Sequence, residues 1–227
     1  ERLLKMILNF LIKLKMIEFF LEPYKDKTSF DIIIEIIVFF FGIISVWYAK
    51  KENILVYPTG LIATILSTYL LYKAGYFADM TINVYFSIMS IYGWMIWSKT
   101  KNDVAVYQIS RTNTKQKIIG VILFFVTIVV MYGVYQLFDR PILEENYIDM
   151  FTSGLFFTGM WFMAIKKIEN WTLWIIADLI SIPLYGYRGL GILSLQFLIF
   201  TVLAVMAYME WNKVIKDRKQ NLEVNNG

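Results

Sequence analysis

The sequence AGYFADMTINVYFSIMSIYGWMIWSK at positions 74–99 can be laid without a gap over RGLGILSLQFLIFTVLAVMAYMEWNK at positions 188–213. The two stretches share few residues, but these occur in the same order: Gly75 with Gly189, Phe86 with Phe200, Met95 with Met209, Trp97 with Trp211, and Lys99 with Lys213. In each stretch a turn precedes an apolar run of about 20 residues, the length at which a helix crosses the hydrocarbon core of a bilayer. The match therefore predicts a duplicated unit that ends in a transmembrane helix.

Similar apolar runs recur along the chain, separated by short clusters of charged residues. We place them at residues 32–48, 54–72, 78–97, 118–138, 147–165, 171–187 and 192–211. Their length and their lack of strict alternation favour helices over barrel strands. Of the 227 residues, 58% are hydrophobic and 18% charged, too apolar a composition for a soluble domain of this size. We therefore expect an all-α membrane protein with seven transmembrane helices.

The duplication divides these seven helices into two units of three, joined by the fourth. The short sequence KKEN at positions 50–53 resembles KKIEN at positions 166–170, which adds to the match. Because one crossing separates the units, both have the same orientation, which makes the repeat parallel. The predicted organisation is an amphipathic or interfacial segment (1–29), a first repeat (30–99), a basic loop with the linker helix (100–146), a second repeat (147–213) and a cytoplasmic tail (214–227) that we expect to be disordered.

The basic residues predict the orientation in the membrane. Thirteen Lys and Arg residues follow the first, third, fifth and seventh runs, whereas the opposite side has three in its loops and two just before the first run. The positive-inside rule therefore places the C-terminus in the cytoplasm. Four more basic residues lie in the first 15 positions. That segment has two alternatives to an interfacial helix: it could be an eighth crossing, or Met16 could be the true start.

The composition excludes several kinds of chemistry. The chain contains no cysteine and no histidine, so thiol catalysis, disulfides, serine–histidine pairs and the commonest metal ligand are absent. It has no phosphate-binding loop of the ATPase type, and its carboxylates are not grouped as in a metal site or a hydrolase. Its basic residues are at helix ends, as in membrane proteins and unlike nucleic-acid binders. We expect no enzyme activity, no cofactor, no metal and no nucleic-acid partner.

Polar and aromatic residues form stripes on two of the predicted helices, at 171–187 and 78–97, and the run at 192–211 adds Gln196. On the run at 171–187 they recur every three or four positions and so share one face: Trp171, Trp174, Asp178, Ser181 and Tyr185. Asn83 and Gln196 occupy nearly matching positions in the two repeats and could bind the hydroxyl groups of a sugar. Polar groups within a membrane usually face a bundle interior or a water cavity, so we predict that these seven residues bind a solute. The alternatives are an interfacial belt for the tryptophans and interhelical hydrogen bonds for the polar groups.

These stretches resemble the PnuC family of vitamin transporters, best known for nicotinamide riboside. The similarity rests on PTG at 58–60, YLLYKAGYFAD at 69–79, SIYGWMIW at 90–97 and ENWTLW at 169–174, followed by Asp178, Ser181 and PLY at 183–185, within about residues 30–213. The resemblance implies a three-plus-one-plus-three arrangement related to the SWEET sugar transporters and a homotrimer. It also implies that an unphosphorylated vitamin enters by facilitated diffusion and is trapped by phosphorylation in the cytoplasm.

The resemblance also implies the substrate and the location. Nicotinamide riboside combines a cationic aromatic ring with a ribose, which suits tryptophan faces and amide side chains. The expected location is the cell membrane, the inner membrane in a Gram-negative organism. Thiamine also carries a cationic aromatic ring, and a related branch of the family transports it, so this second vitamin is the first alternative. A membrane scaffold without transport activity is the other.

Overall fold

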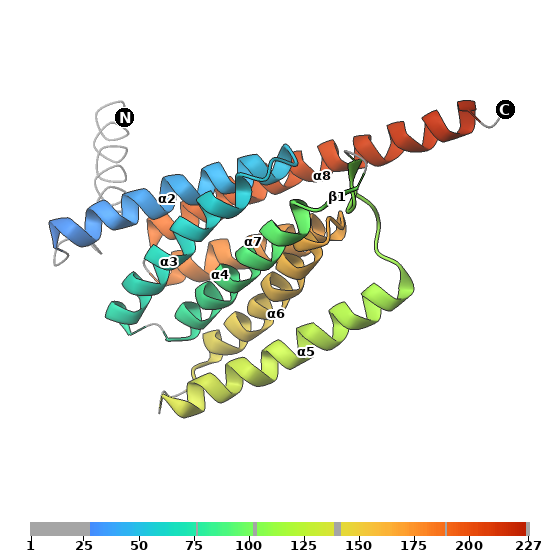
Figure 1. Cartoon of the computed structure of the whole chain (residues 1–227). Helices are drawn as coiled ribbons and strands as arrows, with labels where there is room; N and C mark the ends of the chain where they lie inside the picture. The colour runs from blue at the N-terminus through green and yellow to red at the C-terminus, as the bar shows by residue number, and fades with distance from the viewer. Residues whose placement is uncertain (1–27, 76, 102–103, 139–141, 189, 226–227) are drawn as a thin grey trace, which may run out of the picture.

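The computed structural model describes residues 28–75, 77–101, 104–138, 142–188 and 190–225 (Figure 1). Within these residues the chain forms seven helices and one antiparallel hairpin: α2 (Ser29–Lys50), α3 (Val56–Ala74), α4 (Phe77–Trp97), β1 (Thr100–Lys101), β2 (Val104–Ala105), α5 (Thr114–Leu137), α6 (Glu144–Ala164), α7 (Glu169–Tyr187) and α8 (Gly191–Asn225). The helices cover the seven predicted runs, and the all-helical prediction is confirmed. The predicted interfacial segment lies, up to residue 27, outside the described residues.

Local sequence signals set several helix ends. The Thr28 side chain accepts a hydrogen bond from the Asp31 amide and caps α2. At the start of α5, Asn113 and Gln116 form a reciprocal capping box, which satisfies two amides that the first helical turn leaves without partners. Gly75 ends α3 with a left-handed φ of 76°, a conformation that costs glycine little.

The first two helices before α5 correspond in length to the first two after it. Helices α2, α3 and α4 have 22, 19 and 21 residues, and α6 and α7 have 21 and 19. The bends after α2 and after α6 also match. Glu52 and Lys166, which are 114 residues apart, both have a φ of 54°. The surrounding amides donate hydrogen bonds to carbonyls at the same 114-residue offset.

This offset corrects one part of the sequence comparison. The KKEN and KKIEN motifs pair Lys50 with Lys166, a separation of 116 residues, but Lys50 is the last residue of α2, whereas Lys166 lies in the bend after α6. The residue that has the backbone position of Lys166 is Glu52. A pair of lysines was a misleading marker because helix ends on one side of a membrane commonly carry basic residues, whatever their register.

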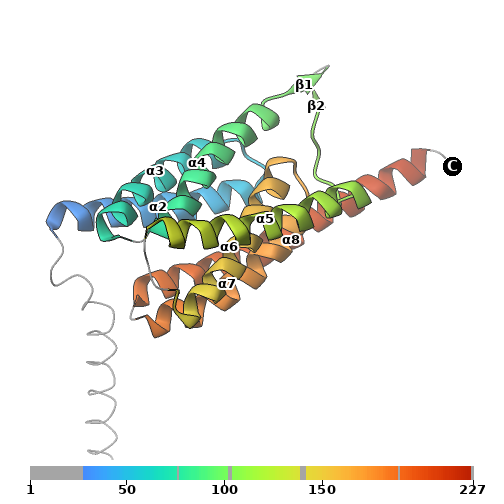
Figure 2. The ribbon, with the colours of Figure 1, turned by 90° about the horizontal axis from the view of Figure 1, so that it is seen from below.

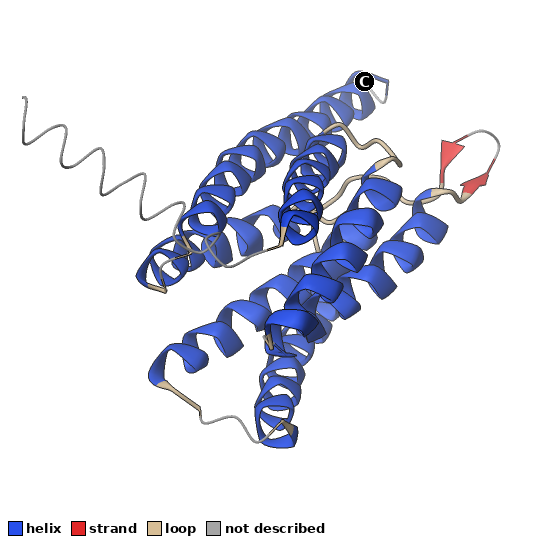
Figure 3. Ribbon diagram, turned by 90° about the vertical axis from the view of Figure 1, so that its left-hand side faces the viewer, coloured by secondary structure: helices blue, strands red, loops and turns tan. Residues whose placement is uncertain are grey.

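The two groups of three helices pack against each other through reciprocal contacts. Helix α2 packs on α8, and α4 packs on α6. Helix α5 packs mainly on α6; it lies along the lower edge of the bundle in Figure 1 and crosses in front of the other helices in Figure 2, which is seen from below. The β1–β2 hairpin projects from one end of the bundle (Figure 3). This arrangement surrounds a central space with six helices and leaves α5 outside it.

Three helices in the described part are long and apolar enough to cross a membrane by length and composition alone: Ser29–Lys50, Thr114–Leu137 and Gly191–Asn221. Only 17–22% of each apolar stretch is buried, so most of these residues face outward. Helix α6, by contrast, buries Asp149, Thr152, Ser153 and Thr158 against the rest of the protein. Interior packing therefore explains why this helix is less apolar overall.

The expected disordered tail after residue 213 is wrong for most of its length. Helix α8 continues to Asn225 and extends beyond the bundle (Figure 1). The Arg218 guanidinium donates a hydrogen bond to the Ile109 carbonyl at 2.9 Å, which ties the extension to the loop before α5. Lys219 and Glu223 form an i,i+4 ion pair on its surface. High polarity suggested disorder, but a segment without Gly or Pro can continue an existing helix at little cost.

Candidate functional site

A cavity of about 630 Å³ lies between the two groups of helices. Side chains from α2, α3, α4, α6, α7 and α8 line it, and none from α5 does. Its volume falls within the range of about 300–1,000 Å³ that is usual for small-molecule sites. Most of the wall is apolar, with a limited number of polar groups that could orient a bound solute.

Five of the seven predicted site residues line this cavity: Asn83, Trp174, Asp178, Tyr185 and Gln196. The other two do not. Trp171 is fully buried and packs edge-on against Trp174 and Trp211, with ring centroids 5.5 Å and 5.4 Å apart. Ser181 is 1% exposed and is also outside the lining. Binding by any of the seven remains a prediction, but only these five lie where a solute in the cavity could touch them.

The polar groups of these residues differ in their existing partners. The Asn83 amide donates a hydrogen bond to the Asp79 carbonyl at 2.9 Å, within its own helix. The Trp174 indole donates to the Phe156 carbonyl at 3.4 Å. Within the described residues, neither the Asp178 carboxyl nor the Gln196 amide has a hydrogen bond or an ion pair. Both residues line the cavity and their polar groups are not committed to a protein partner, so these two side chains are the best placed to bond a ligand.

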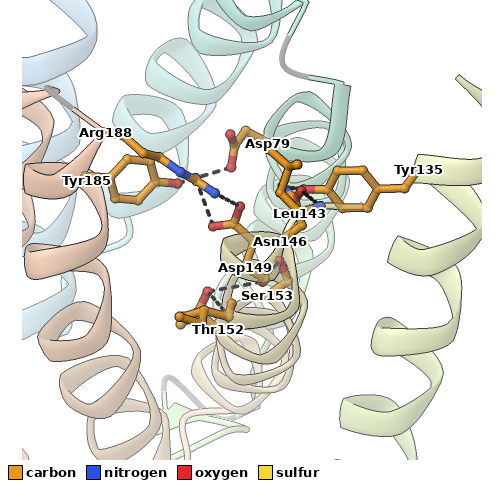
Figure 4. Close-up of polar contacts among 10 residues, drawn as sticks. Asp79, Tyr135, Leu143, Asn146, Asp149, Thr152, Ser153, Tyr185 and Arg188 are labelled. Carbon is orange, nitrogen blue, oxygen red and sulfur yellow. Dashed lines mark hydrogen bonds and ion pairs between the residues drawn. The ribbon is translucent and has the colours of Figure 1, made fainter. Parts of the chain in front are cut away.

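Ion pairs cross one end of the cavity. Arg188 binds the Asp149 carboxylate through two hydrogen bonds of 2.6 Å and 3.2 Å (Figure 4). Beside them the Tyr185 hydroxyl donates to Asp79 Oδ1 at 3.2 Å. Burial lowers the pKa of the Arg188 guanidinium, but the hydrogen bond and the charge of Asp149 outweigh that effect and raise the pKa above its usual value. Arg188 therefore remains a cation, and it fixes Asp149 at this end.

A second ion pair occupies the same end in the first group of helices. Lys73, near the end of α3, contacts Asp31 near the start of α2 at 2.5 Å. Arg188 and Asp149 are likewise near the end of α7 and the start of α6. Each group of helices thus joins its first two members by one acid–base pair at this end.

Acidic groups outnumber basic groups around the cavity. Four carboxylates line it, Asp31, Glu35, Asp79 and Asp178, against two cations, Lys73 and Arg188. This excess favours a positively charged or neutral solute over an anion. Among the described residues, no group of three His, Cys, Asp or Glu side chains could hold a metal ion.

Of the six charged lining residues, five were not among the predicted site residues: Asp31, Glu35, Lys73, Asp79 and Arg188. Each is near a helix end, where a charged residue ordinarily meets water or lipid headgroups, so hydropathy gives no reason to place it beside an internal cavity. One signal was available. Glu35 and Asp149 are separated by 114 residues, the offset that relates positions 74–99 to 188–213, so an acidic residue recurs at the same place in the two matched units.

The opposite end of the cavity is closed by aromatic side chains. Tyr57 lines the cavity there, and its ring meets the Trp97 ring edge-on at 5.2 Å. Trp171 and Trp211 repeat this contact at 5.4 Å, and Trp97 and Trp211 lie 6.4 Å apart. All four residues are at most 6% exposed. The cavity therefore has a charged end and an aromatic end.

Comparisons with known proteins agree with this architecture. A family model described as "Nicotinamide mononucleotide transporter" matches residues 32–213. Two curated relatives, both named "Nicotinamide riboside transporter PnuC", come from Escherichia coli strain K12 and from Shigella flexneri. Each is 24% identical over 200 residues, which cover 78% of this chain and 84% of the relative. The crystal structure of the vitamin B3 transporter PnuC matches with a TM-score of 0.65 and 20% identity, over 80% of this chain and 81% of that one. At this identity the structural match shows the fold.

Proposed function

This chain belongs to the nicotinamide mononucleotide transporter family, whose model matches most of its length, and we propose that it carries nicotinamide riboside across a membrane. Its named relatives are nicotinamide riboside transporters and not enzymes. The observation that carries the proposal is the pairing of Trp174 and Asp178 on the wall of one cavity. These residues are one helical turn apart on α7, so an aromatic face and an unpaired carboxyl meet the same solute.

The chemistry of nicotinamide riboside fits this pair. Its pyridinium ring is aromatic and positively charged, so a tryptophan face can attract it by stacking and by cation–π interaction. A nearby carboxylate adds direct charge pairing in a site with little water. The ribose hydroxyl groups can then bond to Asn83 and Gln196, which also line the cavity. Tyr185 completes the proposed set at the charged end.

The charge of the cavity favours nicotinamide riboside over nicotinamide mononucleotide, the compound named in the family's description. The mononucleotide carries a phosphate, which adds negative charge to the solute. The excess of carboxylates around the cavity would repel that group, and both lining cations already face carboxylates, Lys73 facing Asp31 and Arg188 facing Asp149. We therefore expect the unphosphorylated riboside to be the solute that binds.

Titrations of the purified protein would test this assignment. Nicotinamide riboside is expected to bind, whereas nicotinamide mononucleotide and riboflavin are not. Thiamine is the decisive competitor because its thiazolium ring is also cationic and aromatic. Tight binding of thiamine without binding of the riboside would replace the proposed substrate. Binding of none of these compounds would contradict a vitamin carrier and leave the scaffold alternative.

We also propose a three-plus-one-plus-three architecture of the SWEET type, in which α2–α4 and α6–α8 are parallel repeats and α5 is the linker. Three observations support it: the matching lengths of α2 with α6 and of α3 with α7, the common 114-residue offset of the two bends, and the reciprocal packing of α2 on α8 and of α4 on α6. With all seven helices crossing the membrane, the basic loops and the C-terminus lie in the cytoplasm. Proteolysis of sealed vesicles from either side would test that orientation.

The proposed transport mode is facilitated diffusion, with phosphorylation inside the cell retaining the vitamin. The protein is proposed to act as a homotrimer in the cell membrane, which is the inner membrane in a Gram-negative organism. In proteoliposomes that contain only this chain, labelled riboside should equilibrate across the membrane without accumulating. Accumulation driven by an imposed sodium or proton gradient would contradict diffusion. Mass measurement of the protein in detergent would test the trimer.

A further inference from the structure

Helix α6 packs directly against the Trp174 side chain. Gly159 faces the indole so closely that a Cβ atom at this position would overlap Nε1 and Cδ1 of Trp174. Three residues earlier on the same helix, the Phe156 carbonyl accepts the indole hydrogen bond at 3.4 Å. The Trp171 ring meets the indole edge-on from α7 itself. The absence of a side chain at position 159 therefore decides how far the indole withdraws from the cavity.

We propose that Gly159 is a positioning residue for the solute, because it fixes the plane and depth of the Trp174 ring. This inference rests on the proposed function. The indole is rigid, so a methyl group at position 159 has to be accommodated by rotating or displacing the whole ring. Such a displacement pushes the ring into the cavity that Trp174 lines, and it lengthens the bond to the Phe156 carbonyl.

The Gly159→Ala variant tests this role with two glycine controls. We expect its affinity for nicotinamide riboside to fall by at least about tenfold, since small displacements of a binding group are costly. Gly133→Ala on α5 places its Cβ in open space and should leave affinity unchanged. Gly154→Ala, also on α6, meets the Phe124 ring on α5 and should lower thermal stability without changing affinity. Equal affinity of Gly159→Ala and the wild type would overturn the proposal.

A double-mutant cycle separates positioning from general damage to the fold. In the Trp174→Phe background the smaller ring leaves room for a Cβ, so Gly159→Ala should change affinity by less than about twofold. A tenfold loss in that background as well would mean that Gly159 acts independently of Trp174, and the proposal would fail. If wild-type protein does not bind the riboside at all, the proposed function fails instead. The two failures are therefore distinguishable.

A second inference rests on the aromatic end of the cavity. Tyr57, Trp97, Trp171 and Trp211, which we call the aromatic quartet, consist of two pairs related by the 114-residue offset. Across the quartet the Glu52 carboxylate pairs with the Lys166 ammonium at 2.7 Å. The Lys166 ammonium also lies 4.6 Å from the centre of the Trp97 ring. A cation from the second repeat thus covers a ring of the first repeat and pairs with an acid of the first repeat.

The quartet also holds polar groups that lack protein partners. The Tyr57 hydroxyl and the Trp171 and Trp211 indole N–H groups are buried without a hydrogen bond to any described residue. Trp97 differs, because its indole N–H contacts the Met163 and Ala164 carbonyls at 3.4 Å and 3.2 Å. Separation of the two repeats at this end would give the three remaining groups access to water, which offsets part of the cost of parting the rings.

We infer that the aromatic quartet and the Glu52–Lys166 pair are the gate that closes the cavity toward the basic loops. The ion pair joins the α2–α3 bend to the α6–α7 bend, so it must break when the repeats move apart. Among the described residues, Glu210 on α8 adds a weaker link of the same kind, 3.3 Å from Lys51 and 3.7 Å from Lys50 on the α2 side.

The chain has no cysteine, so a single reporter thiol can test the gate. Ser90 lines the cavity and is 3% exposed. In a Ser90→Cys protein in vesicles, Glu52→Gln should speed labelling by an impermeant thiol reagent, added on the face with the basic loops, by about tenfold. The control is Glu223→Gln, which removes an exposed ion pair with Lys219 and should change nothing. The charge-swapped protein, with Glu52→Lys and Lys166→Glu, should regain protection.

The outcomes of this labelling experiment are distinct. Faster labelling that depends on Glu52 and occurs only from the basic-loop face supports the gate. No acceleration, an equal acceleration in Glu223→Gln, or an acceleration from the opposite face would each overturn it. Labelling requires no transported solute, so the result does not depend on which vitamin the protein carries.

Discussion

The side chains of Glu52 and Lys166 meet at 2.7 Å although the residues occupy equivalent positions in two different bends, each with a φ of 54°. Contact between equivalent residues is expected only close to a symmetry axis. Trp97 and Trp211, which share the 114-residue separation, also contact each other. An axis of approximate twofold symmetry would therefore run through the aromatic end of the cavity, between Glu52 and Lys166. Because one of these two residues is an acid and the other a base, their side chains attract each other.

Removing the acid from this pair should destabilise the protein. The Lys166 side chain is 4% exposed, so Glu52→Gln leaves a buried ammonium without its carboxylate. Since Glu52 is itself about one-third exposed, we expect a loss of about 2 kcal/mol, below the range for fully buried pairs. Thermal unfolding in detergent measures this. The Glu52→Gln, Lys166→Met double variant should recover most of the loss, and failure to recover would mean that the ion pair is not the cause.

Arg188 and Asp149 should behave as one unit at the charged end. Their side chains are 19% and 9% exposed, so Arg188→Gln leaves a buried carboxylate and should lower stability by about 3 kcal/mol. The Arg188→Gln, Asp149→Asn double variant removes both charges and should be more stable than Arg188→Gln alone. Melting temperatures of Arg188→Gln, of Asp149→Asn and of the double variant provide the test. Additive losses would show that the two residues do not depend on each other.

Asp178→Asn should weaken the binding of a cationic solute while preserving the shape of the site. The substitution removes the charge of a carboxyl that has no partner among the described residues, and we expect a loss of affinity of about tenfold or more. Asp217→Asn on the exposed part of α8 is the matched control. Calorimetry with nicotinamide riboside measures both. Unchanged affinity in Asp178→Asn would remove this residue from the site.

Gln196→Ala should cost more affinity than Asn83→Ala. The Gln196 amide has no hydrogen bond within the described part of the chain, whereas Asn83 already donates to the Asp79 carbonyl. We expect about fivefold for Gln196 and less for Asn83, in line with about 1 kcal/mol for one hydrogen bond. Neither variant should alter the binding of free nicotinamide, which has no ribose. Equal losses for both ligands would contradict a role in ribose recognition.

The sequence determined the number and approximate limits of the helices, because apolar run length and helix-end signals are local properties. It also predicted a duplication through the match of positions 74–99 with 188–213. The same kind of reasoning failed for the KKEN and KKIEN motifs and for residues 214–225, where composition was a poor guide. Basic residues mark a side of the membrane and not a register, and polar residues can extend a helix as well as disorder it.

Tertiary structure alone decided which polar residues reach the cavity. Helical periodicity put Trp171, Trp174, Asp178, Ser181 and Tyr185 on one stripe. A stripe is wider than a cavity wall, however, and Trp171 and Ser181 are buried outside the cavity lining. The pairings of Glu52 with Lys166 and of Asp149 with Arg188 bring together residues 114 and 39 positions apart. Such contacts depend on how helices pack, which the pattern within any single helix does not contain.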